Sequence, residues 1–122
     1  MERKIDWMEL EVVNNVAKQR AAKAAKKYLD EAYDGKDNFP CGFAWARFSQ
    51  IRKNSKLGKA LAKIGIEWHD WVRRFEVWNP ANIPVQNVDV KYVGARAFAE
   101  VWNEYFKKLD VNVRVYYDSR WD

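Results

Sequence analysis

The chain has 122 residues, which fits a single domain spanning 1–122 and leaves too little sequence for a second independent core. Hydrophobic residues are plentiful, seven of them Trp, while Gly and Pro are scarce, so the composition excludes a disordered chain. The net charge is +5, the one cysteine excludes an internal disulfide, and the absence of a long apolar run excludes a membrane span.

The first predicted element is a long helix from Ile5 to Tyr33, within the N-terminal segment 1–34. It contains no Gly or Pro, is rich in Ala, Lys and Glu, and repeats apolar residues every three to four positions. At 1.5 Å per residue it would be roughly 40 Å long, which exceeds the width of a domain of this size. We therefore expect it either to break near Asn14–Asn15 or to project its first half. A projecting half that carries Trp7 and Met8 would need a partner, and self-association is the simplest one.

An α+β core, 41–122, follows a turn that contains Gly35 and Pro40. It opens with a predicted strand from Cys41 to Ser49, and the alternation of this strand puts two sets of side chains on opposite faces. One set is Phe43, Trp45 and Arg47, and the other is Ala44, Ala46 and Phe48.

Next we expect a short helix from Lys56 to Ile64, with Ser55 as its N-cap and Gly65 at its C-terminal end. Residues 66–78 have strand character throughout. We predict two strands with a turn near Trp71–Arg73, and one long bent strand is the alternative.

The third predicted helix runs from Val90 to Leu109, with Asp89 as its N-cap and Gly94 permitting close approach to the sheet. The last predicted strand runs from Val111 to Tyr117. The order is therefore a helix followed by β-α-β-β-α-β. That order predicts an α+β fold of the ferredoxin-like split βαβ type, an antiparallel sheet with helices on one face. The other face must be covered by the first helix, by a second subunit or by a ligand. The fold itself specifies no activity.

Five separated motifs follow one another along the chain: CGFAW at 41–45, VWNP at 77–80, QNVD at 86–89, GARAFAEV at 94–101 and SRWD at 119–122. This set resembles a family of small tailed-bacteriophage proteins of uncharacterised function, over roughly residues 25–122. The chain departs from the family at Trp71–Arg74, where the family has glycines in a turn. The resemblance implies a phage protein that acts in the cytoplasm of a bacterial host. An N-terminus without the apolar stretch of a signal peptide agrees with that location. The resemblance transfers no catalytic residue.

No catalytic constellation stands out. His69 is the single histidine and is followed by Asp70, so a general base is chemically conceivable, but a metal site needs further ligands. We favour a polar strand or turn residue. Cys41 lacks an identified base, so we favour a structural thiol. Enzymatic activity is left open, a non-enzymatic role is favoured, and we expect no metal and no cofactor.

Positive charge is concentrated in the middle of the chain. Residues 41–80 carry eight basic and three acidic side chains, a difference equal to the whole net charge. One interpretation is a solvated face, and the other is an anion or nucleic-acid site in which basic side chains contact phosphates and Trp45 stacks on a base. The candidate basic residues are Arg47, Arg52, Lys53, Lys56, Lys59 and Lys63.

The favoured function is a non-catalytic protein-interaction module that binds a host or phage protein or assembles with itself, and nucleic-acid binding is the alternative. Exposed aromatic and Arg side chains are typical anchors of protein interfaces. The candidates for such contacts are Trp7, Met8, Tyr116, Arg120 and Trp121.

Overall fold

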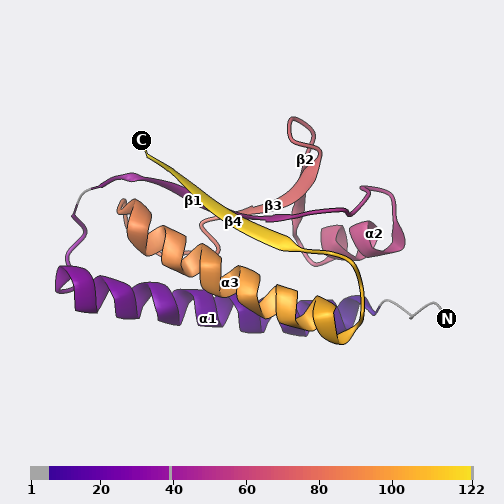
Figure 1. Ribbon diagram of the computed structural model, residues 1–122, viewed down its shortest axis with the longest axis horizontal. Helices are drawn as coiled ribbons and strands as arrows, with labels where there is room; N and C mark the ends of the chain where they lie inside the picture. The colour runs from indigo at the N-terminus through magenta and orange to yellow at the C-terminus, as the bar shows by residue number, and fades with distance from the viewer. Residues whose placement is uncertain (1–5, 39, 122) are drawn as a thin grey trace.

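The computed structural model describes residues 6–38 and 40–121, and it builds them from three helices and a four-stranded antiparallel sheet (Figure 1). The predicted α+β class and the order of elements are confirmed, including two separate strands between residues 66 and 78. The strand order across the sheet is β2-β3-β1-β4, so β1 and β4, the first and last strands in the sequence, are neighbours. The elements are α1 (Trp7–Tyr33), β1 (Gly42–Phe48), α2 (Lys56–Lys63), β2 (Glu67–His69), β3 (Arg74–Trp78), α3 (Val88–Lys108) and β4 (Val115–Trp121).

Helix α1 is continuous from Trp7 to Tyr33, so the break expected near Asn14–Asn15 is wrong. The expected start at Ile5 lies outside the described residues, and Asp6 caps the helix by accepting a hydrogen bond from a backbone N–H of the first turn. The first half does not project alone, because α2 packs beside it. Leu10 is buried there, and the Lys63 ammonium of α2 lies 4.2 Å from the centre of the Trp7 ring.

Helix α1 packs along α3 through small side chains. Ala17, Ala21 and Ala25 of α1 are completely buried. A Cβ at Gly94 of α3 would lie 2.7 Å from the Cβ of Ala81 and 3.5 Å from that of Ala25. Gly94 therefore permits close approach to α1 and the loop after β3, and the expected approach to the sheet is wrong.

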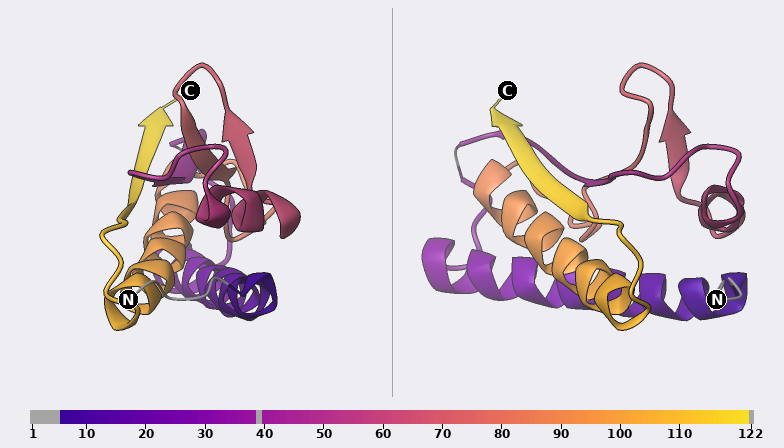
Figure 2. Two further views of the ribbon diagram at one scale, coloured as in Figure 1. Left: turned by 90° about the vertical axis from the view of Figure 1, so that its right-hand side faces the viewer. Right: turned by 45° about the vertical axis from the view of Figure 1, so that its right-hand side comes forward.

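The sheet, α3 and α1 form three successive layers, with α1 on the far side of α3 from the sheet (Figures 1 and 2). The layer between the sheet and α3 is an aromatic core in which the rings of Phe48 and Trp102 have centroids 5.2 Å apart. Because α1 joins the helical side, it does not cover the second face of the sheet. Within residues 6–38 and 40–121, no helix covers that face.

Strand β4 occupies Val115–Trp121, so the predicted range Val111–Tyr117 is wrong. Residues 111–114 instead lead from α3 to the sheet. Asn103 of α3 fixes the start of β4, because its side chain accepts a hydrogen bond from the Val115 N–H at 2.6 Å and donates one to the Val115 carbonyl at 2.9 Å. A side chain distant in sequence, and not local alternation, therefore decides where the last strand begins.

Helix α3 begins two residues earlier than predicted, and its N-cap is Asn87 in place of Asp89. The Asn87 side chain accepts a hydrogen bond from the Val90 N–H at 3.1 Å. Asp89 instead accepts a hydrogen bond from the Tyr33 hydroxyl at 3.0 Å, which ties the end of α1 to the start of α3. The predicted cap of α2 is confirmed, since Ser55 accepts from the Gly58 N–H at 3.0 Å. In the described part of the chain, no helix combines the length and apolar character needed to cross a membrane.

Candidate nucleic-acid interface

The face of the sheet opposite the helices, here called the open face, carries aromatic and charged side chains from all four strands. In β1 the buried residues Gly42, Ala44, Ala46 and Phe48 alternate with more exposed ones, as the sequence predicts. The antiparallel register then extends the same face across the sheet. Its members are Phe43, Trp45 and Arg47 of β1, Arg74, Glu76 and Trp78 of β3, Tyr116, Asp118 and Arg120 of β4, and Glu67 and His69 of β2.

An aromatic cluster of Phe43, Trp45 and Trp78 occupies the two central strands of this face. The Trp45 and Trp78 rings have centroids 5.2 Å apart, and Phe43 meets Trp78 edge to face at 5.9 Å. Phe43 and Trp78 keep 45% and 43% of their surface exposed, and Tyr116 on the adjacent strand keeps 55%. Exposed rings held by their neighbours are rigid stacking platforms for other flat groups.

Glu76 of β3, next to the aromatic cluster, is buried and its charge is neutralised by Arg47. Its side chain has no exposed surface, and one carboxylate oxygen accepts from the Arg47 guanidinium at 2.5 and 2.6 Å. The other oxygen accepts from the Trp78 indole N–H at 3.0 Å. The acid therefore presents little negative charge to a ligand, and it fixes the orientation of the Trp78 ring.

A second group of cations lies where β1 leaves the sheet and meets the β2–β3 turn. A depression of about 510 Å³ there is lined by Arg52, Lys53, Arg73 and Arg74, together with uncharged residues that include Trp68. We call these four cations the basic pocket. Among the described residues, the one ion pair they form is between Lys53 and Asp70, at 4.0 Å.

Gly58 lets the chain bring Arg52 and Lys53 to this pocket. A Cβ at Gly58 would overlap the Arg52 carbonyl oxygen and would lie 2.7 Å from that of Lys53, so any side chain would displace the loop. Ser55 also holds the loop, because its hydroxyl donates to the Arg52 carbonyl at 2.7 Å. The loop is therefore packed against the first turn of α2.

The structure distributes the predicted basic residues over separate surroundings. Arg47 pairs with Glu76, Lys63 lies over Trp7, and Arg52 and Lys53 join the basic pocket. Lys56 and Lys59 are exposed on α2. Sequence reasoning missed Arg73 and Arg74; the available signal was two adjacent arginines in the turn of the predicted hairpin.

The residues predicted for protein contacts also occupy different surfaces. Trp7 and Met8 lie on α1, Tyr116 and Arg120 lie on the open face, and Trp121 is 71% exposed at the far end of β4. His69 is half-buried in β2, opposite Arg74 of β3. Cys41 is also half-buried, and its backbone forms an isolated antiparallel β-bridge with Asn87. Within the part of the chain that the structure describes, no three His, Cys, Asp or Glu side chains are grouped as metal ligands.

Comparison of the chain with protein-family models, with curated proteins and with solved structures finds no match. A function therefore has to be inferred from the geometry of this chain, and the resemblance to tailed-phage proteins stays a prediction from motifs.

Proposed function

We propose that this protein binds single-stranded nucleic acid on the open face, with bases stacked on the aromatic cluster and the backbone held by the basic pocket. The observation that carries the proposal is the position of Trp45 and Trp78. They lie side by side on the two central strands, on a face that none of the three described helices covers. A platform of this kind suits unpaired bases, because every base has a flat face that can stack on a ring.

The strand order supports a ferredoxin-like split βαβ arrangement, to which α1 adds a further layer. RNA-recognition modules with this arrangement stack two or three bases on aromatic residues of their sheet. The chain departs from their longer motif at Arg74–Trp78, which lacks its glycine and carries Glu76. The likeness is therefore one of surface chemistry and not of motif.

Charge completes the site at one end. Arg74 belongs to both the open face and the basic pocket, so the two are continuous along β3. From Trp78 to Arg74 the strand spans about 13 Å, which a short oligonucleotide can bridge. In a duplex the faces of the bases are stacked inside, so the aromatic cluster favours single strands over duplex. Because the sequence motifs resemble those of tailed-phage proteins, we propose that the protein binds nucleic acid in the cytoplasm of a phage-infected bacterium.

The test is fluorescence anisotropy with labelled oligothymidylate, oligouridylate and a duplex, each at low and high salt. Trp45→Ala or Trp78→Ala should weaken single-strand binding by about 1–3 kcal/mol, or roughly 5- to 150-fold in Kd. Trp121→Ala removes an equally large but more exposed ring outside the open face and should leave Kd unchanged. Equal losses in all three variants, or no binding at low salt, would overturn the proposal.

A matched pair of charge variants tests the basic pocket. Arg52→Gln with Arg73→Gln should weaken binding and reduce the salt slope by about 0.7 for each lost phosphate contact. Lys56→Gln with Lys59→Gln removes the same charge from α2 outside the pocket and should have a smaller effect. The reverse ranking would move the phosphate contacts to α2.

Binding of a host or phage protein is the second candidate function, and the geometry of β4 favours it. This strand forms one edge of the sheet and carries Tyr116 and Trp121, both more than half exposed. An edge strand can pair with an extended segment of a partner, while pockets beside it take alternate side chains. This candidate is supported if the oligonucleotides fail to bind and Trp121→Ala abolishes the capture of a defined host protein.

A further inference from the structure

The outer face of α1 carries three exposed apolar side chains in the first half of the helix. Met8, Val12 and Val16 follow one another at intervals of four residues and keep 57%, 62% and 37% of their surface exposed. Residues buried against the body, such as Leu10 and Ala17, lie on the opposite side of the helix. Among the helices and strands that the structure describes, none packs against this outer face (Figures 1 and 2).

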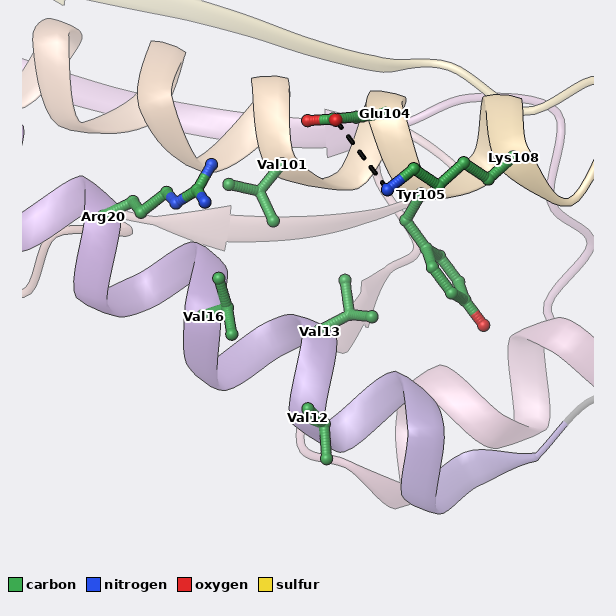
Figure 3. A pocket seen from close by; sticks show the side chains of 8 residues that line it. All are labelled: Val12, Val13, Val16, Arg20, Val101, Glu104, Tyr105 and Lys108. Carbon is green, nitrogen blue, oxygen red and sulfur yellow. Dashed lines mark ion pairs between the residues drawn. The ribbon is translucent and has the colours of Figure 1, made fainter.

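A groove of about 230 Å³ between α1 and α3 continues this apolar surface. Figure 3 shows Val13 and Val101 between the two helices and Val12 on the outer side of α1. Arg20 of α1 and Glu104 of α3 also line the groove, so its walls combine an apolar centre with charged ends.

The charge along α1 changes sign at its middle. Residues 6–17 include three acids and no Lys or Arg, whereas residues 18–27 include five bases and no acid. With 3.6 residues per turn, Glu9 and Arg20 lie about 60–80° to the groove side of Val12, whereas Lys18 lies about 120° to the other side. Glu9 lies close to Tyr105 of α3. Burial raises the pKa of Tyr105, and the hydrogen bond with the Glu9 side chain raises it further.

We infer that α1 pairs antiparallel with α1 of a second copy of this chain, about a two-fold axis level with the Asn14–Asn15 peptide. In this register, two residues lie level with each other across the interface when their residue numbers add up to 29. Glu9 therefore meets Arg20 of the second copy, and symmetry forms this ion pair twice. Val12 and Val16 interleave with their counterparts between these ion pairs. A parallel pairing would oppose acid to acid and base to base, which is unfavourable.

The shape of the molecule makes this interface independent of the proposed nucleic-acid site. The outer face of α1 and the open face lie on opposite sides of the stacked layers (Figure 2). A dimer through α1 would therefore present two open faces pointing away from each other, which increases avidity for a strand long enough to reach both.

The experiment is sedimentation velocity on the full chain over a range of concentrations, with circular dichroism to confirm folding. The wild type should show a reversible monomer–dimer equilibrium, and Val12→Glu should remain monomeric. Glu9→Lys and Arg20→Glu should each weaken the dimer, and the double variant should restore it, because each ion pair then forms with reversed polarity.

Lys18→Glu is the matched control. It reverses the same charge on the same helix but away from the seam, so it should not rescue Glu9→Lys. A local effect of losing the contact between Glu9 and Tyr105 would likewise not be rescued from Arg20, eleven residues away along the helix. A wild type that is monomeric at every concentration, or a double variant that fails to recover, would overturn the inference and leave the nucleic-acid proposal untouched.

Discussion

The interaction between Arg47 and Glu76 gives the sharpest prediction about stability. The Glu76 side chain is completely buried, and its donors are the Arg47 guanidinium at 2.5 and 2.6 Å and the Trp78 indole at 3.0 Å. Arg47→Met keeps the aliphatic stem but leaves a buried carboxylate with one donor. Loss of one partner of a buried ion pair costs about 3–5 kcal/mol. For a chain of this length that corresponds to a fall in Tm of roughly 12–20 °C.

Changing the other partner, Glu76, should lower the free energy of unfolding by less, because the two side chains differ in exposure. Arg47 keeps 32% of its side chain exposed, so its charge can be solvated after Glu76→Gln. The amide that replaces the carboxylate still accepts the indole hydrogen bond from Trp78, and we expect a loss of about 1–2 kcal/mol. Replacing both partners at once, Arg47→Met with Glu76→Leu, should recover most of the loss seen in Arg47→Met alone.

The assay is urea unfolding followed by far-UV circular dichroism, with the free energy of unfolding extrapolated to water and the m-value checked for each variant. The decisive comparison is between the two single variants. A loss in Glu76→Gln equal to or greater than that in Arg47→Met would refute the reasoning from burial.

Three further variants test close packing at two glycines and the hydrogen bonds at the start of β4. Gly94→Ala should destabilise the protein by about 1–3 kcal/mol in the same unfolding assay, because the new Cβ would lie 2.7 Å from that of Ala81, and an unchanged stability would contradict the close packing. Gly58→Ala should displace the Arg52 loop and weaken oligonucleotide binding more than it lowers stability, whereas wild-type affinity would show that the loop does not matter. Asn103→Ala leaves a buried N–H and carbonyl at the start of β4 without their partner and should cost about 1–3 kcal/mol; hydrogen exchange at the start of β4 that stays as slow as in the wild type would argue against this clamp.

The local elements were largely predictable from the sequence, because their signals come from neighbouring residues. Period-two alternation separated Phe43, Trp45 and Arg47 from the core residues of β1, and the Ser55 cap marked the start of α2. The last strand was misplaced because residues 111–117 alternate as a strand should, while the hydrogen bonds that define β4 come from Asn103 and from β1. Local pattern does not specify which distant segment satisfies a backbone group.

The candidate site shows the same division. The sequence itself determined that the middle of the chain is basic, that Trp45 shares a face with Arg47, and that α1 has an acidic and a basic half. Only the tertiary structure decided that α1 packs on α3 and leaves the sheet open, that Glu76 neutralises Arg47, and that Arg73 and Arg74 join Arg52 and Lys53. The physical reason is that periodicity fixes which side of an element is apolar, whereas the partner of that side depends on long-range packing among several surfaces that could each cover it.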